Sequence, residues 1–400
     1  MNKEVMNDLI MKYGEAFYLV DSQQFRRNFL ELKDAFSEIY PFFNIAYSYK
    51  TNYMPKFCQI VNELGGYGEV VSEMELELAL RCGVRPENII WNGPIKNPEI
   101  TKTFLLDGGT INVDSKDEAE YIWDLAKIAE KPLNVGIRCN FDVNDGVISR
   151  FGLDVEGEDF KKVLEIVTDT RNIRLINFQC HFAKRQIDYW HARVNGMIEL
   201  IDRLGIIPER IDIGGGIYGK MDDSLKAQFS SEIPSYKAYA KAAAASFSDY
   251  FQNKDFKPEL LIEPGSAVVG DCMKFAGTVK TIKNVRGKHI ATVLGSQKNI
   301  NMDRVNPPIE IIHMGGRAAK YEDLDMVGFT CIEGDVLYKK YSGYLAKGDV
   351  VIFGNCGSYS LVMKPPFILP NFPVLDICGE QEEVLKRRET FDDIFHTFNF

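Results

Sequence analysis

The chain has 400 residues, 45% of them hydrophobic, and a formal net charge of −10 at pH 7. This length predicts two domains, the composition is that of a globular protein, and the negative charge without a long basic run argues against a nucleic-acid partner. No stretch approaches the roughly 18 apolar residues of a membrane span, and the N-terminal segment lacks the apolar core of a secretory signal. Eight cysteines occur singly, without a CxxC pair, which predicts reduced thiols in a cytoplasmic protein and no metal site.

Short apolar runs alternate with longer amphipathic stretches over the first two thirds of the chain. Eight such runs, each next to a helix-like stretch, are typical of an α/β fold in which a (β/α)8 TIM-like barrel closes on itself. Acidic residues follow Ser115, which is therefore expected to be the N-cap of a helix. The barrel is predicted over residues 23–265, with strands at 44–49, 68–72, 88–93, 109–114, 134–140, 175–182, 210–215 and 259–265.

The sequence changes character after Gly265. Alternating apolar and polar residues, separated by glycine and proline turns, predict a C-terminal antiparallel β domain. The apolar run 16–20 is expected to pair with this domain, which then comprises residues 1–22 and 266–400. Residues 379–395, "GEQEEVLKRRETFDDIF", are expected to form a solvated amphipathic helix.

Polar and glycine residues gather at the C-terminal ends of the predicted strands, where such barrels carry their functional groups. Taken singly, each has an ordinary explanation: a surface lysine or arginine, a satisfied core histidine, a glycine turn, or a carboxylate that caps the next segment. Their shared position on one rim predicts a site made of Lys50, Glu69, Arg138, His181, Gly214, Gly215, Gly216 and Glu263.

The chemistry that suits this set is that of pyridoxal 5'-phosphate. The amine of Lys50 can carry the cofactor covalently, and the backbone N–H groups of a glycine-rich turn can approach its phosphate. A carboxylate such as Glu263 can keep the pyridine nitrogen protonated, so that the ring accepts an electron pair. The flat ring of His181 can stack on the cofactor.

The same residues lie in motifs that resemble the pyridoxal-phosphate decarboxylases of the ornithine and diaminopimelate decarboxylase group, whose barrel is shared with alanine racemase. The pattern is nearest to diaminopimelate decarboxylase, and it covers nearly the whole chain. "YSYKTN" resembles the YxxKxN lysine motif, "FQCHF" the stacking-histidine strand, "IDIGGGIYG" the phosphate loop and "IEPG" the glutamate motif. "GIRCN" places Arg138 near the ring hydroxyl, and "SRFGL" matches a further segment.

The resemblance extends into the β domain. "GFTCIEGD" resembles a loop whose cysteine, here Cys331, enters the active site of the neighbouring subunit, and "NCGSY" places Tyr359 there too. This implies a homodimer with shared active sites. Cys331 is then the expected acid that protonates the substrate carbon; the alternative is a buried structural cysteine.

Two positions around the expected phosphate differ from the family pattern. The family usually has a serine three residues after the stacking histidine, and an arginine directly after the glycine of the glutamate motif. Here these positions hold Lys184 and, after Gly265, Ser266. The hypothesis is an exchange in which Lys184 supplies the cation and Ser266 the hydroxyl; the alternative is a Lys184 that points to solvent.

The substrate-recognition residues differ as well. In the two decarboxylases the residue after the loop cysteine is acidic and binds the distal amine of the substrate, whereas here it is Ile332, followed by Glu333. Arg304 is a candidate partner of a substrate carboxylate, and Glu333 and Tyr359 are further substrate-binding candidates. These differences predict a non-standard substrate, such as a conjugated or carboxylated diamino acid.

The predicted reaction is therefore the α-decarboxylation of an amino acid by Lys50, Glu263, His181 and Cys331. A racemase or epimerase on the same fold is one alternative. Alanine racemases place an arginine at the pyridine nitrogen, so Glu263 favours decarboxylation. A catalytically silent regulatory homologue is the other alternative, and the intact Lys50, Glu263 and Cys331 argue against it.

Overall fold

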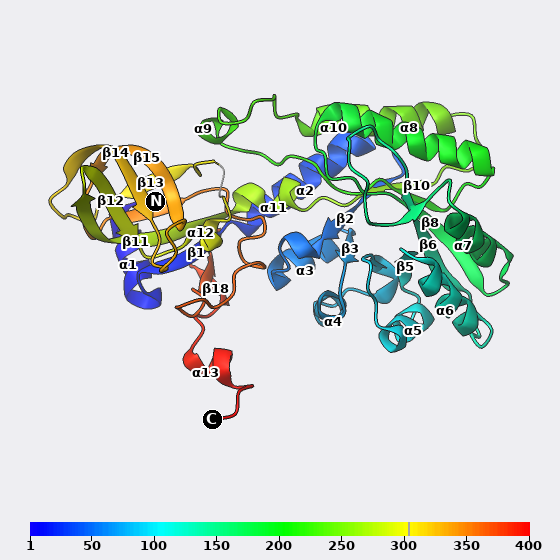
Figure 1. The fold of residues 1–400 in the computed structure, drawn as a ribbon, viewed down its shortest axis with the longest axis horizontal. Helices are drawn as coiled ribbons and strands as arrows, with labels where there is room; N and C mark the ends of the chain where they lie inside the picture. The colour runs from blue at the N-terminus through cyan, green and yellow to red at the C-terminus, as the bar shows by residue number, and fades with distance from the viewer. Residues whose placement is uncertain (303–304) are drawn as a thin grey trace. The chain divides into compact units, whose positions relative to one another are not determined.

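The computed structural model describes residues 1–302 and 305–400, which divide into two compact units (Figure 1). One unit comprises Arg27–Tyr218 and Pro234–Ala267, and the other comprises Met1–Arg26, Gly219–Ile233 and Val268–Phe400. Residues 219–233, which were predicted as part of the barrel, thus group with the other unit.

The first unit is a closed barrel, which confirms the predicted fold class. Within the described residues, eight parallel strands follow the order β5-β4-β3-β2-β10-β9-β8-β6, and pairing of β5 with β6 closes the ring. Most strand residues are buried, because a parallel barrel is covered on its outer face and packed inside. The strands are β2 (Phe43–Ser48), β3 (Tyr67–Val70), β4 (Ile89–Trp91), β5 (Thr110–Val113), β6 (Leu133–Asn140), β8 (Ile173–Gln179), β9 (Arg210–Asp212) and β10 (Glu259–Ile262), and the short β7 (Leu153–Asp154) extends the pairing of β6.

Helices alternate with the strands of the barrel and lie outside the ring (Figure 1). Ser115 caps one of them, as predicted, because its side chain accepts a hydrogen bond from the N–H of Glu118. None of the helices in the described part of the chain is long and apolar enough to span a bilayer. The helices next to the barrel strands are α2 (Ser22–Ser37), α3 (Pro55–Glu63), α4 (Glu73–Arg81), α5 (Pro98–Leu106), α6 (Lys116–Ala126), α7 (Glu158–Asp169), α8 (Ile187–Leu204), α10 (Tyr236–Phe251) and the short α11 (Ser266–Val269).

The second unit is built on a largely antiparallel sheet, as predicted. Strand β1 (Ala16–Val20) pairs antiparallel with β11 (Met273–Val285), which confirms that the N-terminal strand belongs to this sheet. Its other strands are β12 (Lys288–Val293), β13 (Ile309–Ile312), β14 (Ala319–Val327), β15 (Val336–Leu345), β16 (Val350–Phe353), β17 (Val374–Asp376) and β18 (Glu383–Lys386). Short helices complete the unit: α1 (Lys3–Tyr13), α9 (Asp223–Lys226), α12 (Gln297–Ile300) and α13 (Phe391–Phe395).

The prediction of one amphipathic helix at residues 379–395 was wrong. Residues Glu383–Lys386 form strand β18, which pairs antiparallel with β17. Helix α13 begins only after Thr390, whose side chain accepts a hydrogen bond from the N–H of Asp393 in a capping box. A neighbouring strand with free hydrogen-bonding groups thus determined the structure of this segment, against its local helix preference.

Candidate active site

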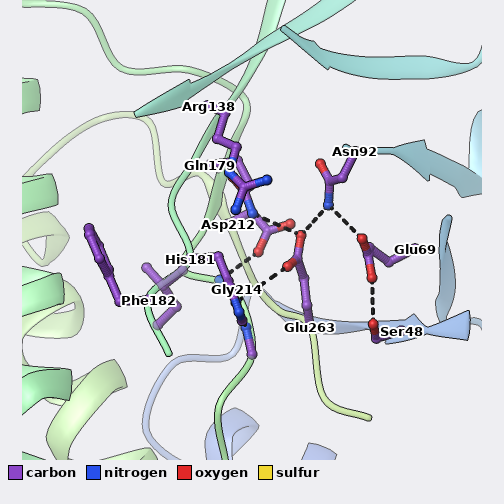
Figure 2. Close-up of polar contacts among 12 residues, drawn as sticks. Ser48, Glu69, Asn92, Arg138, Gln179, His181, Phe182, Asp212, Gly214 and Glu263 are labelled. Atoms are coloured by element: carbon purple, nitrogen blue, oxygen red, sulfur yellow. Dashed lines mark hydrogen bonds and ion pairs between the residues drawn. The ribbon is translucent and has the colours of Figure 1, made fainter. Parts of the chain in front are cut away.

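Most predicted site residues of the barrel unit lie at or just after the C-terminal ends of its strands, and Figure 2 shows Glu69, Arg138, His181, Gly214 and Glu263 among them. Lys50 follows β2 in a short 3-10 turn (Tyr49–Thr51), where its ammonium donates to Glu69 Oε2 at 2.7 Å. The hydroxyl of Ser48 donates to the same oxygen at 2.6 Å. Burial alone would raise the pKa of Glu69, but the Lys50 charge and the hydrogen bonds outweigh it and lower this pKa. Glu69 is therefore ionised and holds the amine of Lys50 at the rim.

A buried asparagine joins this pair to the second carboxylate. Asn92 Nδ2 donates to Glu69 Oε1 at 3.0 Å and to Glu263 Oε1 at 2.6 Å, and Figure 2 shows it between the two carboxylates. Gln179 Nε2 also donates to Glu263 Oε1, at 3.1 Å. Neither amide donates to Glu263 Oε2, so this oxygen fits the pyridine nitrogen of the expected cofactor.

The pKa values of the central carboxyl groups follow from burial and mutual repulsion. Burial and then the Glu69 carboxylate raise the pKa of Glu263, while the charges of Lys50 and Arg138 oppose the shift. Burial and the neighbouring Glu263 raise the pKa of Asp212 well above its ordinary value. A pyridinium group beside Glu263 would supply the positive charge that this crowded acidic cluster needs.

Two more asparagines continue the amide network across the barrel interior. Asn177 Nδ2 donates to Asn112 Oδ1 at 3.0 Å, and Asn112 Nδ2 donates to Asn92 Oδ1 at 2.7 Å. All three side chains are buried. Gly136 on β6 makes room for them, since a Cβ there would lie 1.9 Å from Asn112 Oδ1. We call Asn177, Asn112 and Asn92 the amide ladder.

His181 follows β8 and is a neutral ring. Its Nδ1 accepts a hydrogen bond from the N–H of Gly215 at 2.9 Å, which leaves the proton on Nε2. Burial and then the charges of Lys50 and the surrounding arginines lower the pKa of His181 well below its usual value. The 4.0 Å approach of Nδ1 to Glu263 Oε2 is therefore no ion pair. The side chain remains 32% exposed, which leaves surface on which a cofactor ring can stack.

The glycine turn after β9, Gly214 to Gly216, leaves open space that side chains on these residues would occupy. Gly214 and Gly216 have φ of 71° and 92°, which glycine adopts without strain. A Cβ on Gly214 would lie 2.4 Å from the carbonyl oxygen of Cys180, and one on Gly215 would lie 2.4 Å from that of Glu263. The N–H of Gly214 donates to Asp212 Oδ1 and that of Gly215 to His181, whereas the N–H of Gly216 has no acceptor among the described residues.

The remaining predicted cofactor residues of the barrel unit have ordinary partners. Arg138 Nη1 lies 3.4 Å from Asp114 Oδ2, and its guanidinium lies over the ring of Phe151. Lys184 is half-buried, with its ammonium 6.0 Å from the centre of the Tyr189 ring. At Gly265 a Cβ would lie 1.9 Å from Thr51 Oγ1, and the next residue, Ser266, begins α11. Their roles toward the cofactor stay predictions.

The remaining predicted site residues belong to the β unit. Cys331 and Glu333 are exposed between β14 and β15, and the loop is held by Asp335, whose carboxylate accepts the N–H of Gln297 at 2.6 Å. Tyr359 is half-buried with φ of 60°. Arg304 lies outside the described residues. The expected entry of Cys331 and Tyr359 into a neighbouring site also stays a prediction.

Sequence reasoning missed four buried residues of the site: Asn92, Gln179, Asp212 and Arg193. The first three carry a signal, since each is a polar residue at the end of an apolar strand. Arg193 carries none, because an arginine in an amphipathic helix is usually exposed.

Comparison with known proteins agrees with this geometry. Residues 22–270 match the family model described as "Pyridoxal-dependent decarboxylase, pyridoxal binding domain". The chain is 24% identical to a diaminopimelate decarboxylase of Aquifex aeolicus, over 97% of this chain and 93% of the relative, and 26% identical to one of Methanothermobacter thermautotrophicus, over 98% and 93%.

Solved structures show the same fold. The diaminopimelate decarboxylase from M. jannaschii superposes with a TM-score of 0.87 at 22% identity, covering 98% of this chain and 94% of that one. The lysine/ornithine decarboxylase from Vibrio vulnificus gives a TM-score of 0.73 at 18% identity, over 91% and 94%. The family match covers more than half of the chain, which therefore belongs to the pyridoxal-dependent decarboxylases, enzymes that use pyridoxal phosphate.

Proposed function

We propose that this decarboxylase removes the α-carboxylate of an amino acid, with Lys50 as the covalent anchor of the cofactor and Glu263 as the partner of its pyridine nitrogen. The observation that carries this assignment is the hydrogen-bonded path Lys50–Glu69–Asn92–Glu263. When bound, pyridoxal phosphate supplies an electron-accepting ring for the pair of electrons that departing carbon dioxide leaves on the substrate.

The chain's own residues would prepare that chemistry. Ionised Glu69 holds the amine of Lys50 at the strand end, and Glu263 Oε2 would hold a proton at the pyridine nitrogen. His181, neutral because Nδ1 accepts the Gly215 N–H, would cover one ring face and exclude water from it. Arg138 would face the ring hydroxyl, with Gly265, Ser266 and Lys184 near the phosphate, where Tyr359 of the partner subunit would join them.

We infer that the substrate is non-standard, for example a conjugated or carboxylated diamino acid. The support is Ile332, an apolar residue 57% exposed in the Cys331 loop at the position where the acidic residue is expected. Glu333 is one residue beyond the position of the expected acidic residue, and a carboxylate displaced by one residue points away from the expected binding position of the distal amine. The relatives named as diaminopimelate decarboxylases make diaminopimelate itself the competing substrate.

Release of carbon dioxide from a panel of amino acids tests this proposal. The panel contains diaminopimelate, ornithine, lysine, and carboxylated or conjugated diamino acids, and optical rotation is followed in parallel to detect racemisation. We expect the highest kcat/KM for a member of the last group, and a gain on diaminopimelate when Ile332 is changed to Glu. Highest activity on diaminopimelate in the parent enzyme would refute the non-standard substrate.

We further propose a cytoplasmic homodimer in which Cys331 and Tyr359 complete the partner's site. The eight unpaired cysteines support a reducing compartment. Mixed Lys50→Ala and Cys331→Ala chains test the shared site. If each site takes one residue from each chain, random pairing restores about one quarter of parent activity. Mixtures that stay inactive would contradict the shared site.

A further inference from the structure

Arg193 is a charged side chain in the barrel unit with no exposed surface. It comes from the middle of α8, and its guanidinium lies 4.3 Å from the ring centre of Trp190 and 5.7 Å from that of Phe182. Within the described residues, no carboxylate oxygen lies within 4 Å of it. A buried charge without a counter-charge is costly, and an arginine does not lose its proton in this environment. A bound anion near the Arg193 guanidinium would therefore stabilise its charge.

All of its hydrogen bonds go to backbone carbonyl groups around the glycine turn. Nη1 donates to the carbonyl oxygens of Ile213 at 2.8 Å and Gly215 at 2.7 Å, and Nη2 donates to that of Phe182 at 2.8 Å. Trp190 Nε1 adds a fourth bond, to the carbonyl oxygen of Gly216 at 3.3 Å. Arg193 and Trp190, three residues apart on one helix, thus both donate hydrogen bonds to the turn from one side.

These hydrogen bonds to the carbonyl groups determine the direction of the neighbouring N–H groups. In a trans peptide the C=O and the following N–H point in opposite directions, and the described chain has no cis peptide. The carbonyls of Phe182, Gly215 and Gly216 face Arg193 and Trp190, so the N–H groups of Ala183, Gly216 and Ile217 face away from them. None of these three N–H groups has an acceptor in the described part of the chain. Neighbouring backbone N–H groups without an internal acceptor can together bind an anion.

We propose that Arg193, with Trp190, is the positioning residue for the cofactor phosphate: it orients these three backbone N–H groups toward the phosphate and supplies positive charge from behind the turn. Arg193 would thereby supply the positive charge that the family pattern provides through an arginine at the position of Ser266. This assignment rests on pyridoxal phosphate as the cofactor and not on the identity of the substrate.

The planar guanidinium suits this task better than an ammonium. Arg193 Nη1 bridges two carbonyls of the turn, while Nη2 reaches the carbonyl of Phe182 in the loop after β8. A lysine would keep the charge but lose this fixed fork. Lys184, the cation predicted from the sequence, is half-buried beside Tyr189, and within the described residues its ammonium makes no hydrogen bond to the turn.

The test compares binding of pyridoxal phosphate with binding of pyridoxal, which lacks the phosphate, to the cofactor-free full chain by equilibrium dialysis. The ratio of the two dissociation constants measures the phosphate contribution alone. Arg193→Met should reduce this preference for the phosphorylated form by about 10- to 100-fold, as expected for hydrogen bonds with a charged group. Arg193→Lys should recover part of it. In ³¹P NMR, the phosphate bound to Arg193→Met should take up a proton at a higher pH than in the parent.

Arg203→Met is the matched control, because Arg203 lies on the same helix but at its exposed end beside Glu156, and it should leave the ratio unchanged. If Arg193→Met fails to fold, Trp190→Phe removes only the bond to Gly216 and should reduce the ratio about 2- to 10-fold. An equal loss of affinity for both ligands would reduce Arg193 to a structural role and overturn the proposal. So would a ratio that falls in Lys184→Met but not in Arg193→Met or Trp190→Phe.

Discussion

Replacing Asn92 with Leu tests whether one amide holds the two carboxylates of the site in their charged state. The two side chains have similar size, so the change removes hydrogen bonds rather than volume. Asn92 donates to buried Glu69 and buried Glu263. Each hydrogen bond to a charged group contributes about 1.5–3 kcal/mol, so the barrel should lose roughly 3–6 kcal/mol of unfolding free energy at pH 8.

The loss should depend on pH with a definite sign. Hydrogen bonds donated to a carboxylate stabilise its ionised form, and the pKa of Glu69 is lowered in the folded chain. A carboxylate with a lowered pKa contributes stability above its unfolded pKa and loses it as the pH falls. Without Asn92 the pKa of both carboxyl groups rises, so the deficit relative to the parent should be smaller at pH 5 than at pH 8.

Tryptophan fluorescence during urea unfolding measures this effect in the barrel alone, because Trp91, Trp123 and Trp190 are the three tryptophans of the chain and all belong to that unit. Chain concentration is held constant, since association shifts apparent stability. Asn44→Leu is the control: its amide donates to the carbonyl oxygen of Gly65 at the surface. A deficit below about 1 kcal/mol, the size of one neutral bond, or one equal at both pH values, would refute the reasoning.

Three further changes have defined outcomes. Burial raises the pKa of Glu75 to about 7, so the folded chain loses stability as the pH rises from the unfolded value toward 7; Glu75→Gln should raise the barrel's stability by roughly 1–3 kcal/mol at pH 8 and not at pH 4, by the same fluorescence, and equal effects would contradict this. His181→Phe keeps a flat ring but removes the acceptor of the Gly215 N–H, and dialysis should show roughly 10-fold weaker cofactor binding; unchanged binding would argue against this contact. Gly214→Ala places a methyl group 2.4 Å from the carbonyl oxygen of Cys180 at positive φ, so it should lower the thermal midpoint of the barrel, and an unchanged midpoint would show that the turn can adapt.

The barrel could be predicted because its strands are buried on both faces and appear as unbroken apolar runs. The same logic located Lys50, His181 and Glu263, since a polar residue that ends such a run must have a reason to be there. Residues 379–395 failed for the opposite reason. Their charges fit a solvated helix locally, but pairing with β17, far away in the sequence, determined that Glu383–Lys386 is a strand.

Arg193 shows a second limit of sequence reasoning. Its helix position predicts a solvated side chain, and only the fold reveals that the α8 face beneath the glycine turn is fully enclosed. Asn92 was within reach of prediction, because it directly follows the strand Ile89–Trp91. Its double hydrogen bond was not, since that bond depends on the register of β4 beside β3 and on the ring order that brings Glu263, after β10, within reach of Asn92.

The hydrogen bonds of the amide ladder all run in one direction through the barrel interior. Each amide donates toward the carboxylates, and Asn112 and Asn92 also accept from the amide behind them, so none of the three asparagines can turn over without breaking a hydrogen bond. The charges of Glu69 and Glu263 therefore determine how the side-chain amide of Asn177, on β8, is polarised. The side-chain amide resonances of Asn177 and Asn112 should accordingly shift whenever a proton arrives at or leaves Glu263, so they can report the ionisation of the site from within the barrel, without a probe in the site itself.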